Sequence, residues 1–239
     1  KAICYMNRFV YLMKDMKKQV LKEINNSLKN ELNEAYVTQS KKYEISTELL
    51  SEKTKKSHQR ILEDHVKKLN EVSAFLDTAE RELADINNSK LRSLKEDEVY
   101  NLNASFLHAY YFENIGDQNS VINMDSIAFM RLERDFGSFD AWQKDFIACA
   151  LSSRNGWAVT VYNFFLNRYM NVIIDLNSKH VPFASYPVVV LDCWEHAYYR
   201  DYLGDKRSYT FAMMKELRWS RIEERIAKVE AMSKAKQGK

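Results

Sequence analysis

Glycine and proline are scarce in this chain, and their scarcity limits the folds that the sequence can adopt. Only 5 Gly and 2 Pro occur among 239 residues, and both prolines, Pro182 and Pro187, fall in one short stretch. A β-sandwich, a collagen and a low-complexity chain all need more of these residues, because tight turns and triple helices depend on them. We therefore expect mainly long helices, arranged in one large domain or two small ones.

Apolar residues recur at three-to-four spacing through most of the first half, which is the period of a helix. This spacing is clear at residues 5–35 and again at 52–85. Asn87-Asn88-Ser89 breaks the pattern, and Gly116 ends the helix that follows. We therefore predict helices at residues 5–35, 52–85, 97–114, 124–136 and 139–153.

The pattern changes near Gly156, where Val, Ile, Tyr and Trp become frequent. Such β-branched and aromatic residues favour strands. We predict strands at residues 157–162, 169–176 and 186–191, followed by helices at 194–203 and 208–231. A helical first half followed by strands among helices indicates an α+β fold.

Basic residues are concentrated near the N-terminus. Residues 1–45 hold nine Lys and Arg against five Asp and Glu, whereas the rest of the chain is close to neutral. A helix would present on one face the residues Lys14, Lys17, Lys18 and Lys22. Such a face can contact RNA phosphates without reading sequence, or a neighbouring protein, and the alternative is a solvated helix face.

The three cysteines, Cys4, Cys149 and Cys193, lie far apart and form no CxxC pair. This spacing disfavours a disulfide framework or a zinc knuckle and favours a reducing compartment. No apolar run reaches the roughly 18 residues of a membrane-spanning helix, so we expect no membrane span.

The most informative motif is Asp192-Cys193-Trp194-Glu195-His196-Ala197-Tyr198-Tyr199, directly after the last predicted strand. A carboxylate at a strand end and an imidazole four residues later, one turn into a helix, can point at a common centre and hold a metal ion. Taken alone, the Asp–His pair is also explained by an Asp that caps a helix and a His that packs in the core. The complete string resembles the D-x-W-E-H-A-Y-Y signature of iron/manganese superoxide dismutases, and every specified position matches.

Further motifs resemble the same family over residues 45–231. They are Asp135-Phe136-Gly137-Ser138, Asn155-Gly156-Trp157, Asn177 with Pro187, Tyr100-Asn101 with His108 and Tyr110-Tyr111, and Thr54, His58 and Leu69-Asn70. The resemblance implies an N-terminal helical hairpin packed on a C-terminal domain, in which helices surround a three-stranded antiparallel sheet. We accordingly expect a basic helical extension at 1–44, an α-hairpin domain at 45–116 and a C-terminal α/β domain at 117–239.

The resemblance also implies one metal site, with the ligands His58, His108, Asp192 and His196. Three imidazoles and one carboxylate suit iron or manganese and leave a position open for solvent and superoxide. His65 is the competing candidate for the first ligand, because it lies on the same helix face and Leu69-Asn70 match the family only after a shift of one residue. The expected cofactor is iron or manganese, or none if the site is not intact.

Residues around the implied ligands depart from the family pattern. The Gln that bonds the metal-bound solvent is replaced by Ala104 at the iron-type position and by Ser178 at the manganese-type position. Val66 stands at the position of the gating Tyr, and Leu62 stands at that of the gating His. Outer hydrogen bonds tune a metal site, so their loss predicts feeble or absent catalysis and no catalytic residue beyond the ligands.

The dimer face of the family corresponds to Glu195 and Tyr199, although an ordinary salt-bridged helix residue is the alternative for Glu195. A symmetric dimer would lose part of its hydrogen bonding, because Leu62 cannot accept a bond from the Tyr199 hydroxyl. We therefore expect a superoxide dismutase-like partner on this face, with a paralogue favoured over a second copy.

Two functions follow from the resemblance. The changed surroundings of the site and the basic extension resemble superoxide dismutase-like proteins of the mitochondrial ribosome. The preferred hypothesis is a non-catalytic structural component of the small ribosomal subunit in the mitochondrial matrix, in contact with mitochondrial ribosomal proteins and rRNA through its extension. The alternative is an iron/manganese superoxide dismutase that converts superoxide to oxygen and hydrogen peroxide.

Overall fold

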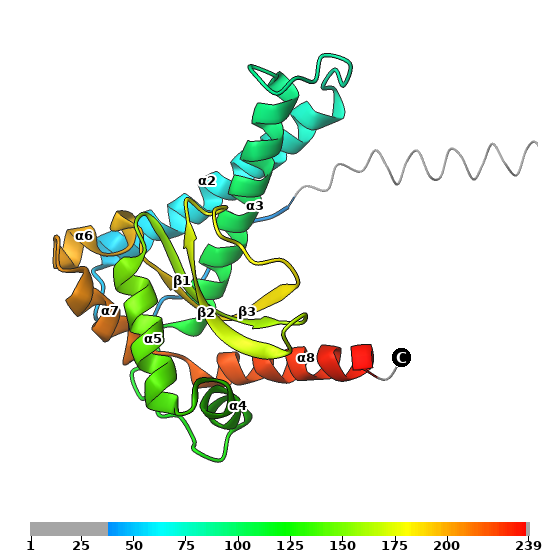
Figure 1. Ribbon diagram of the computed structural model, residues 1–239. Coiled ribbons are helices and arrows are strands. Elements are labelled where there is room, and N and C mark those ends of the chain that lie inside the picture. Colours follow the sequence, from blue (N-terminus) through cyan, green and yellow to red (C-terminus); the bar gives the residue numbers. More distant parts are fainter. Residues whose placement is uncertain (1–37, 238–239) are drawn as a thin grey trace, which may run out of the picture. The chain divides into compact units, whose positions relative to one another are not determined.

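The computed structural model describes residues 38–237. After a non-helical segment at 38–51, two long helices lie side by side (Figure 1). The first helix, α2 (Glu52–Asp77), is capped by the Ser51 side chain, and the second, α3 (Lys90–Asn114), is capped by the Ser89 side chain. Both caps satisfy backbone N–H groups that have no partner inside the helix. The two helices form the predicted hairpin.

The turn between these helices differs from the prediction. Helix α2 ends at Asp77 and not at residue 85, and α3 starts at Lys90 and not at residue 97. Leu83 and Ile86 in the turn are 70% and 80% exposed, so continuing α2 would bury no apolar surface there. The hydrogen bond from the Arg92 N–H to the Ser89 side chain caps α3 at Lys90, more than one helical turn before residue 97, where the sequence predicts its start.

Three strands form the predicted antiparallel sheet in the order β2-β1-β3. They are β1 (Gly156–Asn163), β2 (Arg168–Asp175) and β3 (Ser185–Asp192). The central strand β1 is buried along its whole length. Pro187 lies in β3 beside a shift in the pairing with β1, a position that suits an edge strand because proline has no N–H to donate.

The remaining described helices are α4 (Ile127–Phe136), α5 (Phe139–Ser152), α6 (Glu195–Tyr202), α7 (Lys206–Met214) and α8 (Trp219–Gln237). Helices α4 and α5 pack on β2, while α3 and α8 pack on β3. In residues 38–237 the structure has seven helices and a three-stranded antiparallel sheet, so the predicted α+β fold class and the predicted sheet are confirmed.

The predicted helix at 208–231 is wrong in one respect, because it is two helices, α7 and α8. The backbone between them pairs with the end of α3: the Arg218 N–H donates to Asn114 O at 2.9 Å, and the Asp117 N–H donates to Glu216 O at 3.1 Å. These tertiary hydrogen bonds replace the helical ones that the sequence pattern favours.

Asn114 and Arg225 join α3, β3 and α8 inside the protein. The Asn114 amide donates to Val190 O at 2.9 Å and accepts from the Val190 N–H at 2.8 Å. The Arg225 guanidinium donates to Asn114 Oδ1 at 3.2 Å and to Val188 O at 3.1 Å, and it lies 4.0 Å from the centre of the Tyr110 ring. One buried polar network therefore ties the end of the hairpin to the sheet.

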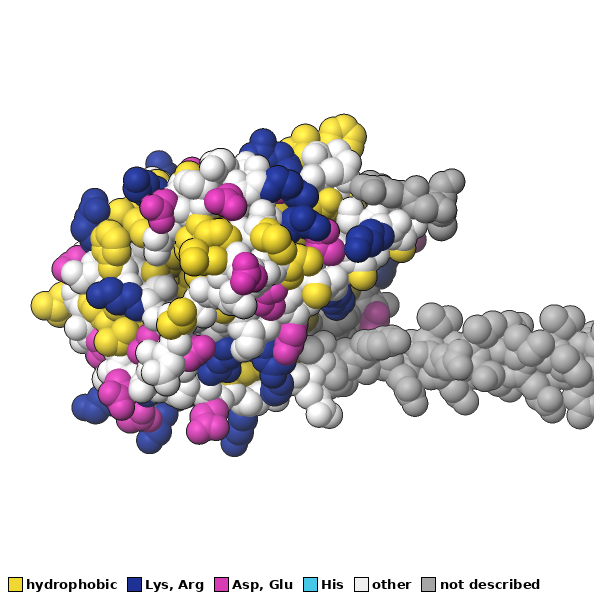
Figure 2. Space-filling model, turned by 90° about the horizontal axis from the view of Figure 1, so that it is seen from below, with side chains coloured by type: hydrophobic (Ala, Val, Ile, Leu, Met, Phe, Trp, Pro, Cys, Tyr) yellow, Lys and Arg dark blue, Asp and Glu magenta, His cyan; other side chains and the backbone are white. Residues whose placement is uncertain are grey.

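Charged side chains of both signs are interspersed over the face drawn in Figure 2, which fits the near-neutral charge expected outside the N-terminal segment. Within residues 38–237, no helix combines the length and the apolar character that crossing a bilayer requires. The predicted helix at 5–35 and its lysines, Lys14, Lys17, Lys18 and Lys22, lie outside the described residues. The domain boundaries at 44/45 and 116/117 stay predictions.

Candidate metal centre

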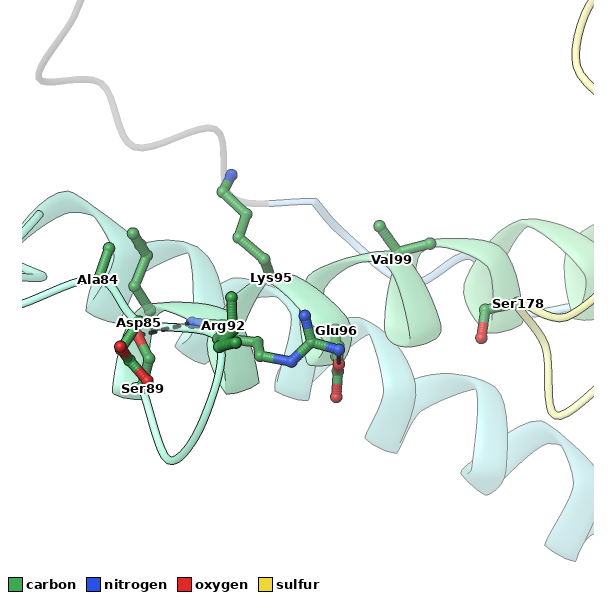
Figure 3. A pocket seen from close by; sticks show the side chains of 10 residues that line it. Ala84, Asp85, Ser89, Arg92, Lys95, Glu96, Val99 and Ser178 are labelled. Carbon is green, nitrogen blue, oxygen red and sulfur yellow. Dashed lines mark hydrogen bonds and ion pairs between the residues drawn. The ribbon is translucent and has the colours of Figure 1, made fainter.

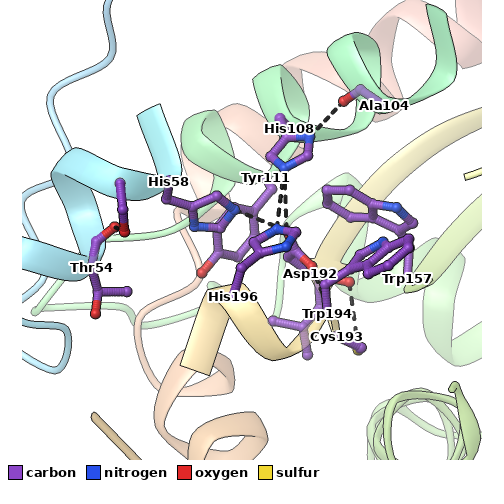
Figure 4. Close-up of polar contacts among 12 residues, drawn as sticks. Thr54, His58, Ala104, His108, Tyr111, Trp157, Asp192, Cys193, Trp194 and His196 are labelled. Atoms are coloured by element: carbon purple, nitrogen blue, oxygen red, sulfur yellow. Dashed lines mark hydrogen bonds and ion pairs between the residues drawn. The ribbon is translucent and has the colours of Figure 1, made fainter. Parts of the chain in front are cut away.

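Four side chains from four separate elements meet between the hairpin and the sheet (Figure 4). His58 belongs to the buried face of α2, and His108 belongs to the buried face of α3. Asp192 is the last residue of β3, and His196 lies in the first turn of α6, which starts three residues later. The strand end and the short helix therefore place the Asp and the second His of the signature motif together.

The candidate ligand atoms of these four residues all lie within 4.8 Å of one another. Asp192 Oδ2 is 2.9 Å from His58 Nε2, 3.1 Å from His196 Nε2 and 3.6 Å from His108 Nε2. The structure thus brings together the whole set implied by the resemblance. His65 is not part of the cluster, because its Nδ1 pairs with Asn101 Oδ1 at 2.9 Å.

Burial and neighbouring groups shift the pKa values of three residues of the cluster. Burial lowers the pKa of His58 and places that of His108 well below its ordinary value, so both imidazoles are neutral. Burial alone would raise the pKa of Asp192, but attraction to His196 and hydrogen bonds from His196 and His58 lower it below its ordinary range. Neutral imidazoles and an ionised carboxylate are the forms that bind a metal ion.

Hydrogen bonds to the backbone fix the orientation of two of these groups. His108 Nδ1 lies 2.7 Å from Ala104 O, and because a carbonyl only accepts, Nδ1 carries the hydrogen and leaves the Nε2 lone pair free. The backbone N–H of Trp194 donates to Asp192 Oδ1 at 2.9 Å, which turns Oδ2 toward the histidines.

Two buried tyrosines support the strand end that carries Asp192. The Tyr209 hydroxyl donates to Asp192 O at 2.8 Å and lies 3.0 Å from the Tyr111 hydroxyl. Burial raises the pKa of both tyrosines, so both stay neutral. Sequence reasoning did not find this role of Tyr209, because no local spacing links it to the signature motif.

The two hairpin helices carry buried apolar side chains on the same faces as His58 and His108. Leu62, Val66 and Ala104 are all buried, and the Phe112 ring lies 4.9 Å from the His58 ring. These residues offer no polar side-chain atom to a ligand of the cluster.

Ser178, the other position at which a Gln is expected, is exposed. Its hydroxyl donates to Leu176 O at 3.2 Å. It lines an open surface pocket of about 490 Å³ together with residues of α3 and of the preceding turn, such as Ser89 and Arg92 (Figure 3). Neither Ala104 nor Ser178 therefore supplies an amide to the cluster.

His196 connects the cluster to the surface, because its side chain is 26% exposed whereas those of the other three residues are buried. It borders an open cleft of about 550 Å³, whose other lining residues are Ser57, Ile61, Glu195, Tyr199 and Arg200. A small ligand can reach the cluster through this cleft. The assignment of Glu195 and Tyr199 to a dimer interface stays a prediction.

The donor set fits an iron or manganese ion. Three imidazole nitrogens and one carboxylate oxygen are donors that suit both metals, and the partly exposed His196 side leaves access for an exogenous ligand. The hydrogens that His58 and His196 donate to Asp192 Oδ2 would move or leave as the ion binds.

Comparison with known proteins points in the same direction. The family model described as the C-terminal domain of iron/manganese superoxide dismutases matches residues 126–225. An iron superoxide dismutase of Cupriavidus metallidurans is 34% identical over 164 residues, which are 68% of this chain and 80% of that protein.

Manganese superoxide dismutases of haloarchaea are also similar. Manganese superoxide dismutase 2 of Haloferax volcanii is 32% identical to this chain, over 51% of this chain and 60% of its own length. Manganese superoxide dismutase 1 of Halobacterium salinarum is 34% identical to this chain, over 54% of this chain and 64% of its own length. The chain thus spans about four fifths of the bacterial protein and about three fifths of these two archaeal ones.

Proposed function

Because the chain belongs to the iron/manganese superoxide dismutase family, we propose that it binds iron or manganese and disproportionates superoxide. The observation that carries the proposal is the set of four donors within 4.8 Å of one another, namely His58, His108, Asp192 and His196. The bound metal would supply the one-electron chemistry, so that two superoxide ions and two protons give one oxygen and one hydrogen peroxide.

The residues of the chain would bind and orient the ion and admit the substrate. Asp192 Oδ2 is aimed at the histidines by the Trp194 N–H, and His108 Nε2 is freed by the bond of Nδ1 to Ala104 O. Superoxide, a small anion, would enter at His196, where the Arg200 guanidinium lines the cleft and attracts negative charge. Protons would enter along the same cleft, past the Tyr199 hydroxyl.

We expect turnover to be slow relative to an enzyme with a complete set of outer hydrogen bonds. Loss of one such partner typically costs about 10- to 100-fold in metal affinity or activity. Here the buried residues Leu62, Val66 and Ala104 have only apolar side-chain atoms, and Ser178 is on the surface.

A second candidate is the non-catalytic role expected from the sequence. The same apolar surroundings of the cluster are the observation in its favour. In this role the chain would be a structural component of the mitochondrial small ribosomal subunit, located in the matrix and paired through Glu195 and Tyr199 with a superoxide dismutase-like partner. The comparisons above give the ribosomal part of this role no support, so we place it second.

Metal analysis combined with a superoxide assay distinguishes the two candidates. The full chain is freed of metal with a chelator, loaded with Fe²⁺ or Mn²⁺, and assayed for bound metal and for superoxide decay above the spontaneous rate. We expect one metal ion per chain, catalysed decay in the loaded protein, and the loss of both in Asp192→Asn.

A matched control is His65→Gln, which changes a histidine on the same helix that pairs with Asn101 and lies outside the cluster. This variant should keep the metal. Stoichiometric metal without accelerated decay would refute the proposed reaction and favour the structural role, for which sedimentation with ribosomal subunits is the direct test.

A further inference from the structure

Asn177 lies in the segment between β2 and β3 and is 1% exposed. Its side-chain oxygen Oδ1 accepts two hydrogen bonds, from the indole N–H of Trp157 at 2.8 Å and from that of Trp194 at 3.2 Å. An indole N–H can only donate, and an amide oxygen has two lone pairs, so this single oxygen satisfies both rings. We call Trp157 and Trp194 the indole pair.

Each ring of the indole pair contacts a different histidine of the cluster. The Trp157 ring lies 4.8 Å from the His108 ring and nearly perpendicular to it, at 83°. The Trp194 ring lies 5.9 Å from the His196 ring and stacks on it at 18°. Figure 4 shows both indoles on the same side of the cluster. Asn177 is therefore connected to two of the four candidate ligands, in each case through one tryptophan.

The backbone of Asn177 is also hydrogen-bonded to another element. Asn177 O accepts a hydrogen bond from the Asn103 side chain at 2.9 Å, which links the loop to the helix that carries His108. The φ angle of Asn177 is 58°, in the left-handed region that Asn tolerates better than most residues. Leu176 beside it has a φ angle of 49°, which is costly for a branched side chain.

We propose that Asn177 is a positioning residue of the metal centre: by holding the indole pair it fixes the ring orientation of His196 and reinforces that of His108, whose Nδ1 is also bonded to Ala104 O. This inference rests on the proposed binding of iron or manganese. Without Oδ1, the buried indole N–H of Trp157 and the half-buried indole N–H of Trp194 lose their acceptor, and the rings turn toward other partners. Both histidines then lose the surface against which they pack.

Three variants separate positioning from simple loop stability. Asn177→Gly removes the side chain but keeps a residue that adopts positive φ freely. Asn177→Asp retains an oxygen acceptor for both indoles. Thr160→Val is the matched control, because Thr160 Oγ1 accepts the indole N–H of Trp142 at 2.9 Å, a buried tryptophan that the structure places outside the cluster.

Two measurements are made on the full chain: hydrogen exchange of the indole N–H groups by NMR, and the Kd for Mn²⁺ of the metal-free protein by calorimetry. In Asn177→Gly we expect faster exchange at Trp157 and Trp194 but not at Trp142, and a Kd raised by about 10- to 100-fold. Thr160→Val should free Trp142 alone and leave the Kd within about threefold. Asn177→Asp should restore slow exchange and most of the affinity.

The inference is overturned if Asn177→Gly binds Mn²⁺ as the wild type does, or if Thr160→Val weakens binding equally. It is also overturned if Asn177→Asp recovers neither the slow exchange nor the affinity. A wild-type chain that binds no Mn²⁺ and no Fe²⁺ would defeat the proposed function and this inference together, whereas intact wild-type binding that is insensitive to Asn177 defeats the inference alone.

Discussion

Replacing Asn114 by Ala should remove a large part of the stability of the fold. Asn114 is fully buried, and its amide occupies both the N–H and the C=O of Val190. Alanine satisfies neither group, and β3 lies at the edge of the sheet, so no neighbouring strand takes them over on that side. A buried backbone group without a partner costs about 1–3 kcal/mol, and two such groups give a loss of about 2–6 kcal/mol.

This loss is large because a domain is usually stable by only about 5–15 kcal/mol. Arg225 limits the damage, since its guanidinium keeps Val188 O, Tyr110 O and the Glu113 carboxylate as acceptors when Asn114 Oδ1 is gone. We therefore expect a folded variant whose free energy of unfolding is about 4 kcal/mol lower than that of the wild type.

Urea denaturation followed by circular dichroism measures the effect, with the free energy obtained by linear extrapolation. Asn119→Ala, an exposed position shortly after α3, is the control and should change the free energy by less than about 0.5 kcal/mol. A loss below about 1 kcal/mol in Asn114→Ala, with an unchanged m-value, would show that the Val190 groups find other partners and would refute the reasoning.

Two further predictions concern stability. Gly156→Ala should lower the free energy of unfolding by about 1–3 kcal/mol, because a Cβ would clash with Ile174 O and lie 2.8 Å from Asp175 Cα in the neighbouring strand. A Cβ at Gly137 would have no atom within 4 Å, so Gly137→Ala should lower the free energy of unfolding by only about 1 kcal/mol, because of the positive φ of 86°. If thermal unfolding showed Gly137→Ala to be less stable than Gly156→Ala, both predictions would be contradicted. The Asp201 carboxylate accepts from the Ser51 N–H at 2.9 Å, and although burial raises its pKa, hydrogen bonds from Ser51 outweigh burial and lower it. A carboxylate with a lowered folded pKa stabilises the fold above its unfolded pKa, and this stabilisation is lost as the pH falls through the folded pKa. Asp201→Asn should therefore lower the free energy of unfolding by about 0.5 kcal/mol at about pH 7 and by less at about pH 3, as measured by urea titration. A loss that grows as the solution becomes more acidic would contradict this prediction.

The sequence predicted the fold class because helical and strand periods are local properties. Asp192 and His196 were predictable for the same reason, since a strand end and one helical turn fix their separation. The choice between His58 and His65 was not local. Packing of α2 decides it: His58 shares the buried face with Thr54 and Leu62, whereas His65 is half-buried and pairs with Asn101.

The features that sequence reasoning missed all depend on contacts between distant segments. The break between α7 and α8 arises from hydrogen bonds to the end of α3, and no spacing in the sequence signals it. The bond from Tyr209 to Asp192 O and the two indole bonds of Asn177 join residues from different elements. Only Asn177 could have been singled out, because it belongs to a family motif, although its partners could not.

The turn between α2 and α3 divides the candidate ligands unequally along the chain. His58 lies before residues 78–89, and His108, Asp192 and His196 lie after them, while Leu83 and Ile86 in that turn are largely exposed. A protease that cuts in this turn would leave one ligand on a short fragment and three on a long one. A coordinated ion would then link two separate polypeptides, because each would supply ligands to it. A chelator would remove this link, and the two fragments of the cleaved protein would dissociate more readily on dilution.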